Sequence, residues 1–228
     1  FFLADNGGCA EGGIWGFERN RNGVLGKNSS FASYGLSWAN ASNTPFREYK
    51  HWVHEGGIAS PFIAHWPAGI EDKGVIRREP CHLIDIAPTL YELAGARYPK
   101  NHGGNGIGGL EGVSLLPALR GEALERPTPI FFEHEGNRAV REGPWKLVSR
   151  HGKPWELHDL STDRSETHDL AAEQPERVAE LTASYDAWAE RCGVLPWPLK
   201  RREGYTPIPY DYPLTYPELE AADARRDD

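Results

Sequence analysis

The stretch Phe1-Phe2-Leu3-Ala4-Asp5-Asn6-Gly7-Gly8 joins a short apolar run to two oxygen-bearing side chains and a pair of glycines. An apolar run bounded by turn residues is typical of a buried strand. Asp5 and Asn6 carry the hard oxygen donors that Ca²⁺ and Mg²⁺ prefer, and the glycines would let the backbone turn sharply away at positive φ. The alternative is a strand followed by a simple Asx turn. We therefore expect a strand end that presents Asp5 and Asn6 either to a metal ion or to a turn.

Composition narrows the class of protein. The chain has 228 residues, of which 39% are hydrophobic, so it can bury one large core or two modest ones. It contains no methionine and opens without a signal-peptide pattern, which favours a processed or truncated piece of a longer protein. No apolar run approaches the roughly 20 residues of a membrane helix, so we expect no membrane span. A net charge of -8 with scattered basic residues argues against a nucleic-acid partner.

Three cysteines without a Cys-x-x-Cys pair predict neither a zinc ribbon nor a closed set of disulfides. The cellular compartment therefore stays open.

The first half of the chain alternates between irregular and regular patterns. Residues 7–48 are rich in Gly, Asn and Ser without a sustained period, which predicts a long, ordered surface excursion rather than regular structure. Loops of that length are usually functional. Residues 58–66 form a short apolar run that predicts a buried strand, with Pro61 near its start. From Leu83 to Leu93 apolar residues recur at helical spacing, and Asp85 as N-cap with Gly95 beyond the end predicts a helix with one buried face.

The segment 101–113 contains a GxGxxG match that follows a helix instead of a strand. We interpret it as a flexible loop and reject a nucleotide site. Ser114 is then expected to cap a short helix that stops at Gly121.

Beyond Pro129 the pattern becomes that of an antiparallel meander followed by one helix. Four short strand-like runs, separated by turn residues, cover 130–134, 138–142, 145–149 and 155–158. Apolar residues then recur at helical spacing from Val178 to Cys192, with Pro175 at the first turn and Gly193 as terminator. We expect the helix to cover the meander as a small α+β subdomain, 127–228, after a first domain of residues 1–126. The last thirty residues predict an extended, fraying tail.

Three strings occur in the order in which they are found in arylsulfatases: Phe2–Gly8, then Asn43–Lys50 with Glu55-Gly56-Gly57, then Trp155–Leu160 with Asp163, Glu166 and Leu170-Ala171. The chain resembles an arylsulfatase from residue 1 to about residue 191, and the combination of strings is specific. It departs at His158, where Tyr is usual, and at Arg164 and Asp169, which replace the common Pro and Asn. These positions lie in the outer subdomain.

The resemblance implies a fold and a chemistry. The fold is α/β: the C-terminal part of an alkaline-phosphatase-like α/β/α domain followed by the small subdomain, a four-stranded antiparallel sheet packed by one helix. The chemistry is hydrolysis of a sulfate monoester, with a formylglycine nucleophile made from Cys or Ser and a divalent cation, usually Ca²⁺, with Mg²⁺ possible. The expected substrate is a small-molecule or carbohydrate sulfate ester.

The family's maturation motif, Cys-x-Pro/Ala-x-Arg, is not found around Cys9, Cys81 or Cys192. The family's first pair of metal-binding Asp residues and its usual catalytic His also precede the Asp-Asn-Gly strand. The chain is thus similar to the C-terminal half only, and we expect it to be inactive by itself.

Carried over to this sequence, the resemblance makes Asp5 and Asn6 metal ligands and gives Lys50 a contact with the sulfate. The roles suit the chemistry, because negative charge develops on the ester oxygens and a compact ammonium can follow it. For a lone lysine on a loop, a solvated surface charge is the ordinary alternative.

Other polar residues near these strings are left outside the catalytic set. His51 and His54 could donate to substrate or be structural, Glu55 is expected to hold the Gly56-Gly57 turn, and His134 could line a substrate pocket. Cys9 is interpreted as a packing residue, because a thiolate is a poor ligand for a hard cation.

Two other functions remain open. One is a phosphomonoester or phosphonate hydrolase of the same superfamily, which the upstream nucleophile motif would distinguish. The other is a truncated or pseudo-sulfatase without catalysis.

Overall fold

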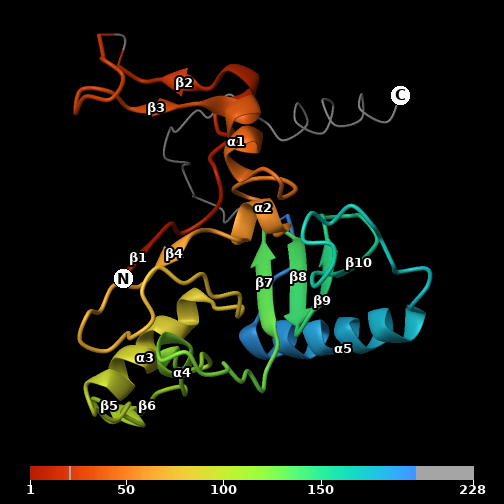
Figure 1. Ribbon diagram of the computed structural model, residues 1–228. Coiled ribbons are helices and arrows are strands. Elements are labelled where there is room, and N and C mark those ends of the chain that lie inside the picture. The colour runs from red at the N-terminus through yellow and green to blue at the C-terminus, as the bar shows by residue number, and fades with distance from the viewer. Residues whose placement is uncertain (21, 199–228) are drawn as a thin grey trace. The chain divides into compact units, whose positions relative to one another are not determined.

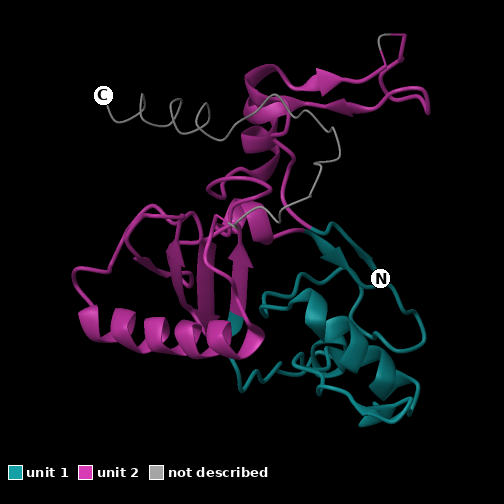
Figure 2. Ribbon diagram, turned by 180° about the vertical axis from the view of Figure 1, so that it is seen from behind, with its two compact units in different colours: residues 1–5, 61–130 teal, residues 6–60, 131–228 magenta. Residues whose placement is uncertain are grey.

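The computed structural model describes residues 1–20 and 22–198 (Figure 1). The predicted tail, residues 199–228, lies outside this range. The chain divides into two compact units: residues 1–5 with 61–130, and residues 6–60 with 131–228 (Figure 2). The division into domains 1–126 and 127–228 stays a prediction, because such units need not coincide with domains. Each unit is described by itself below.

The predicted meander is confirmed. Strands β7 (Ile130–His134), β8 (Asn137–Glu142), β9 (Trp145–Ser149) and β10 (Glu156–Asp159) form one sheet in the order β10-β9-β8-β7. The β7–β8 turn places Glu135 at φ 53 and Gly136 at φ 80. Two successive positive-φ residues are the signature of the tight hairpin turn whose twist matches that of the strands.

One face of this sheet is covered by helix α5 (Pro175–Cys192), as expected. Pro175 begins the helix and Gly193, at φ 69, ends it in the left-handed conformation. Trp188 of the helix stacks on Phe131 of β7, with 5.1 Å between ring centroids. The buried members of this core are Val140, Leu147, Leu157, Leu181 and Tyr185. Cys192, the last residue of the predicted apolar face, is exposed.

The opposite face of the sheet covers a second cluster. Ala139 and Val148 are paired across β8 and β9 and pack with Val53. They alternate along the strands with Val140 and Leu147, so the period of two sends the neighbouring side chains to opposite faces. Residues 53–58, which include helix α2 (Glu55–Ile58), are thus part of this layer.

The segment 7–48 contains more regular structure than we expected. It holds a 3₁₀ turn (Gly13–Trp15), the hairpin of β2 (Phe17–Glu18) with β3 (Ala32–Ser33), and helix α1 (Gly35–Asn43). The prediction of a wholly irregular excursion is therefore wrong. Helix α1 was missed because only Gly35 and Ala39 of it are buried, and two small residues give no apolar period.

In the other unit, β1 (Phe2–Leu3) pairs with β4 (Phe62–Ile63) in antiparallel fashion, and Pro61 precedes β4 as expected. Both strands are shorter than predicted, and the expectation that they are buried is wrong for the described chain. Phe2 is 67% exposed and Ile63 is 57% exposed, because no second layer of the described chain covers them.

The predicted helix of this unit is present as α3 (Ile86–Leu93), but its expected apolar face is open. Leu90 is 52% exposed, whereas Thr89 is fully buried and donates to the Asp85 carbonyl. The side chain of Asp85 does not cap α3. It accepts from the backbone of His82 and Val113 instead, at 2.7 and 2.9 Å, and pairs with Arg126. Asp85 therefore ties two loops together.

The glycine-rich segment forms a small hairpin, β5 (Asn101–His102) with β6 (Asn105–Gly106), where we expected a loop. Helix α4 (Leu116–Leu119) follows, with the Ser114 hydroxyl accepting from the Leu116 amide at 3.2 Å, and Gly121 lies beyond it at φ 85. No helix within the described ranges is both long and apolar enough to cross a membrane.

Candidate functional site

Asp5 and Asn6 follow β1 in a bend. Asp5 is exposed and Asn6 is half-buried, and neither side chain makes a hydrogen bond or ion pair within residues 1–20 and 22–198. Because the two residues are consecutive, their oxygens can approach one ion. The ligand role of Asp5 and Asn6 stays a prediction.

Gly7 and Gly8 are needed for a reason other than the one we expected. Neither has positive φ, so the predicted left-handed turn is wrong. A Cβ on Gly7 would instead lie 1.8 Å from the carbonyl oxygen of Gly56, and the Gly7 amide donates to the Gly57 carbonyl at 2.9 Å. The glycines thus permit two backbone segments to touch. They bring the segment after Asn6 directly against the turn that follows Glu55.

The same close approach fixes Lys50. Its amide donates to the Gly8 carbonyl at 3.0 Å, so Lys50 is anchored two residues after Asn6. Asn43 holds the loop from the other side: its Oδ1 accepts from the Gly8 amide at 2.9 Å, and its Nδ2 donates to the Glu48 carbonyl at 3.0 Å. The structure therefore brings together Asn6 and Lys50, which the sequence separates by more than forty positions.

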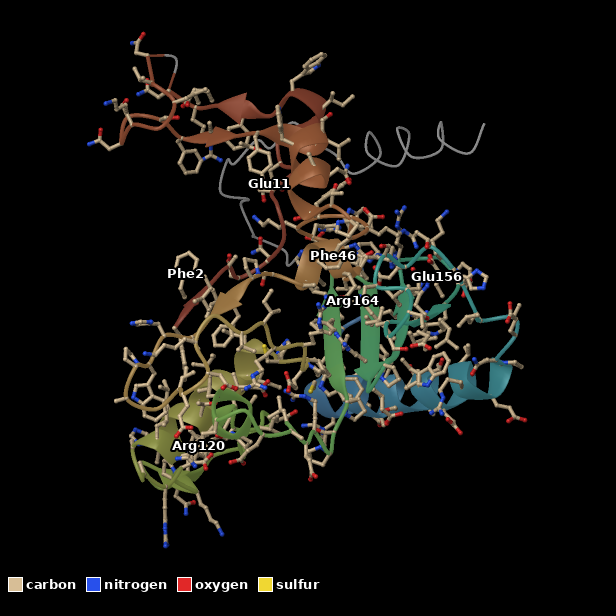
Figure 3. The ribbon with its side chains drawn as sticks, viewed as in Figure 1. Phe2, Glu11, Phe46, Arg120, Glu156 and Arg164 are labelled. Atoms are coloured by element: carbon tan, nitrogen blue, oxygen red, sulfur yellow. The ribbon has the colours of Figure 1, made fainter. Side chains whose placement is uncertain are left out.

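The Lys50 ammonium lies 2.7 Å from a carboxylate oxygen of Glu11 (Figure 3 labels Glu11). The two side chains are 38% and 40% exposed, so the pair faces solvent. The hydrogen bond from Lys50 lowers the pKa of Glu11 below its ordinary value. Sequence reasoning missed Glu11, because no spacing or motif links it to Lys50.

Glu55 occupies the start of α2 and is 1% exposed. It accepts from Lys146 Nζ and from Arg164 Nη2, each at 3.1 Å. Burial raises the pKa of Glu55, but the Lys146 ammonium and nearby guanidinium groups outweigh burial and bring the pKa below its ordinary value. A carboxylate held this way is structural, as expected, although Gly56 and Gly57 lie in helix α2 where we expected a turn.

Lys146 is fully buried between two carboxylates. Its Nζ lies 2.7 Å from Glu166 Oε1, and Glu166 Oε2 accepts from the Glu55 amide at 2.7 Å. Gly56 then donates from its amide to the Arg47 carbonyl at 2.7 Å. Charges on β9 and on the loop after β10 thereby position the segment that carries Lys50. Lys146 was not predicted, since a strand lysine is ordinarily solvated.

Arg47 and Arg164 add further contacts between the segment before Lys50 and the part of the chain that begins at β10 (Glu156–Asp159). Arg47 pairs with Glu156 at 2.5 Å, and Arg164 lies 4.6 Å from the centroid of the Phe46 ring (Figure 3). Burial raises the pKa of Glu156, but hydrogen bonds from His158 and Arg47 outweigh burial and lower that pKa to about 2. His158, where the resemblance expects Tyr, is 1% exposed and lies 3.5 Å from Glu156.

His54 is fully buried, and burial with the nearby Arg47 charge lowers its pKa to about 3. It is therefore a neutral, structural residue, which agrees with its omission from the catalytic set.

Residues 47–187 match the profile of a family described as N-sulphoglucosamine sulphohydrolase, C-terminal. The chain belongs to this family. The match includes Lys50, Glu55, Lys146 and Glu166, so the buried ion pairs lie inside the part that defines this sulphohydrolase family. The residues at the strand end, Asp5 and Asn6, precede it.

Curated relatives of the sulphohydrolase chain are sulfatases. It is 33% identical over 187 residues to an uncharacterized sulfatase of Schizosaccharomyces pombe, a match that covers 76% of this chain and 32% of the relative. It is 37% identical over 123 residues to an arylsulfatase of Klebsiella aerogenes, which covers 50% of this chain and 26% of the relative. The chain thus spans about a third or less of the relatives' length. The expected similarity to arylsulfatases is confirmed.

A solved structure has a similar fold. The crystal structure of Ps i-CgsB is 27% identical with a TM-score of 0.58 and covers 68% of this chain and 34% of that one. The same protein has been crystallised in complex with k-i-k-neocarrahexaose. The predicted mixed α/β fold, with a four-stranded antiparallel sheet packed by one helix, is confirmed.

Proposed function

We propose that the protein hydrolyses sulfate esters and that this chain supplies part of the active site. The main observation that supports the proposal is the hydrogen bond from the Lys50 amide to the Gly8 carbonyl, at 3.0 Å. It anchors Lys50 two residues after Asn6, one of the two candidate oxygen ligands. Membership of the sulphohydrolase family supports the reaction class.

Asp5 and Asn6 would hold the divalent cation, which we propose to be Ca²⁺, with Mg²⁺ as the alternative. The two residues fit such an ion, because their oxygens are hard donors and have no partner within the described part of the chain. A cation bound there supplies positive charge for the ester oxygens. Ca²⁺ takes six to eight oxygens, so further ligands have to come from elsewhere in the protein. The same holds for the formylglycine nucleophile, whose motif this chain does not contain.

Lys50 would donate a hydrogen bond from its ammonium to a sulfate oxygen. The gain is greatest where negative charge grows during the reaction, because a fixed donor there stabilises the transition state more than the bound ester. Glu11 holds the ammonium at 2.7 Å. An incoming sulfate would share the Lys50 ammonium with the Glu11 carboxylate or displace that carboxylate. The Glu11 side chain is 40% exposed and is therefore able to move.

The substrate class we propose is a sulfated carbohydrate or a small sulfate ester. The family description names N-sulphoglucosamine, and Ps i-CgsB was crystallised in complex with k-i-k-neocarrahexaose. Both statements concern other proteins, and they favour a sugar sulfate as the first substrate to try.

The test compares matched aryl esters with the complete enzyme. We expect kcat/KM to be higher for aryl sulfate than for aryl phosphate or phosphonate, and we expect chelation to abolish turnover and added Ca²⁺ to restore it. A higher kcat/KM for the phosphate or phosphonate would overturn the proposal in favour of the related hydrolases. No turnover of these esters or of a sugar sulfate by metal-loaded enzyme would favour a pseudo-sulfatase.

A further inference from the structure

We propose that His51, His134 and Glu135 form a second metal site, selective for a transition-metal ion such as Zn²⁺. These residues come from the Lys50 loop and from the β7–β8 turn. One ligand atom of each lies within 4.8 Å of the others. The proposal does not rest on sulfate hydrolysis, and its test does not use turnover.

The spacing of the ligand atoms suits a four-coordinate ion. His51 Nδ1 lies 3.4 Å from Glu135 Oε2, and the His51 and His134 rings are 5.0 Å apart at their centroids. Zinc–ligand bonds of about 2.0–2.2 Å in a tetrahedron leave neighbouring ligand atoms about 3.4 Å apart. The His51–Glu135 edge already has this length. Only the exposed His134 ring has to move, and water can fill the fourth position.

The donor set distinguishes this site from the one at Asp5 and Asn6. Two imidazoles with one carboxylate suit Zn²⁺ and its transition-metal neighbours, whereas Ca²⁺ and Mg²⁺ prefer oxygen ligands alone. The two sites should therefore take different ions from the same solution. Saturating Ca²⁺ should not fill the cluster at His51.

The backbone at this cluster is held in sparsely populated conformations. Among the described residues four non-glycine residues have positive φ, and two of them are His51 at 96° and Glu135 at 53°. Such conformations cost free energy, and Glu135 adopts one because the β7–β8 hairpin turn needs positive φ there. Here they aim two of the three ligands at a common point.

Asn137 determines where the His51 proton lies in the metal-free protein. Its Oδ1 accepts from the His151 amide at 3.0 Å, and its Nδ2 donates to the His134 carbonyl at 2.9 Å. The amide nitrogen therefore faces His51 Nε2, at 3.2 Å, as a donor. A neutral His51 must then carry its proton on Nδ1, toward Glu135.

Metal binding would move the His51 proton from one ring nitrogen to the other. The ion replaces the proton on Nδ1, and the proton resides on Nε2, so the count of protons on a neutral ring is unchanged. Nε2–H then needs an acceptor, which the Asn137 amide can supply only after it turns over. Carboxylates behind zinc-bound histidines supply such an acceptor. Turning the Asn137 amide over breaks its bonds to the His134 carbonyl and the His151 amide, which reduces the affinity of the site.

The experiment measures Zn²⁺ alone against the complete protein. The sample is stripped with a chelator, saturated with Ca²⁺, and titrated calorimetrically. We expect one Zn²⁺ per chain with a micromolar or lower Kd, and a higher Tm, because an ion that binds only the folded state stabilises it. Replacing Zn²⁺ with Co²⁺ should give the visible absorption of a four-coordinate ion.

His134→Gln and Glu135→Gln should each weaken binding by about tenfold or more. Both residues lie at a surface turn, so the variants are expected to fold, and their Tm without metal checks this. His65→Gln, at an exposed histidine outside the cluster, is the matched control and should bind as the parent does.

Absence of Zn²⁺ binding at these concentrations would overturn the proposal. So would binding that Glu135→Gln leaves unchanged, since the ion would then sit elsewhere. Displacement of the bound Zn²⁺ by excess Ca²⁺ would equally contradict it, because it would place the ion at oxygen ligands.

Discussion

Lys50 combines a fixed backbone with a charged group that remains near the surface. Its amide is bonded to Gly8, whereas its side chain is 38% exposed and pairs with Glu11, which is 40% exposed. Exposed ion pairs contribute little to folding. The side chain is therefore available for chemistry at almost no cost in stability.

Lys50→Ala in the complete enzyme should lower kcat/KM by about a hundredfold or more, as loss of a charged transition-state donor does elsewhere. The Tm should barely change. The matched control is Lys27→Ala, at an exposed lysine, which should leave both quantities unchanged. Near-normal kcat/KM in Lys50→Ala would remove Lys50 from the site.

Glu156 makes stability depend on pH. Its pKa falls from 4.5 to about 2 on folding, because hydrogen bonds from His158 and Arg47 outweigh burial, which is the largest single effect and acts in the opposite direction. A depressed carboxyl pKa adds stability that is complete above the unfolded value and is lost as pH falls toward the folded value. Glu156 should therefore contribute to unfolding between about pH 4.5 and pH 2.

Thermal melts of parent and Glu156→Gln across this range test the assignment. We expect the variant to be less stable near neutral pH and to lose less stability on acidification. Glu142→Gln, at an exposed glutamate of the same sheet, should follow the parent curve. Parallel curves for parent and Glu156→Gln would show that Glu156 does not drive the acid loss.

At the scale of elements, the buried charges connect the sheet to the Lys50 loop. Lys146 of β9 meets Glu55 at the start of α2 and Glu166 in the loop after β10. Lys146 and Glu166 are fully buried, and Glu55 is 1% exposed. A buried ion pair need not stabilise more than apolar packing would, but removal of one partner leaves an uncompensated charge. The network therefore fixes one arrangement of α2 against the sheet.

Lys146→Met keeps much of the volume and removes the ammonium, which leaves Glu166 without its cation and Glu55 with Arg164 alone. We expect a loss of about 3–5 kcal/mol in the free energy of unfolding, measured by denaturant titration. Lys153→Met, at an exposed lysine after the same strand, should leave that free energy unchanged. A small loss in Lys146→Met would mean that the two carboxylates become protonated or solvated without it.

At the scale of the molecule, our proposal is that this chain supplies only some of the residues of the active site. It offers two candidate cation ligands and one lysine, while the maturation motif for a nucleophile is not found around its cysteines. It also exposes large apolar residues, such as Trp15 at 91% and Ile76 at 80%. Both observations are compatible with its span of about a third of the relatives.

The 228-residue chain alone should show no sulfatase turnover and should bind Ca²⁺ only weakly, because two side chains cannot supply six to eight oxygens. Calorimetric titration measures the second part. In the complete protein, Asp5→Ala should lower both metal content and Tm. Micromolar or tighter Ca²⁺ binding by the isolated chain would show that it carries a whole site, and hydrolysis of an aryl sulfate in proportion to chain concentration would contradict the first part.

The sequence by itself determined the elements whose signals are local. The β-meander and α5 could be predicted because turn glycines, a first-turn proline and apolar periods of two and 3.6 residues occur within short windows. The strings around Asp5, Asn6 and Lys50 were also recognisable in order. What those strings do stays a prediction, but their convergence on Gly8 and Lys50 is visible in the structure.

Only the tertiary structure decided which distant residues meet. Glu11 beside Lys50, Lys146 between two carboxylates and His51 beside His134 depend on the path of loops, for which the sequence carries no period. Helix α1 was missed for a related reason, since small residues make a close contact without an apolar pattern. Likewise Gly7 proved necessary because the Gly56 backbone approaches it, a contact between segments far apart in the chain. Local patterns specify elements, whereas pairs of charges and close backbone contacts are set by packing in three dimensions.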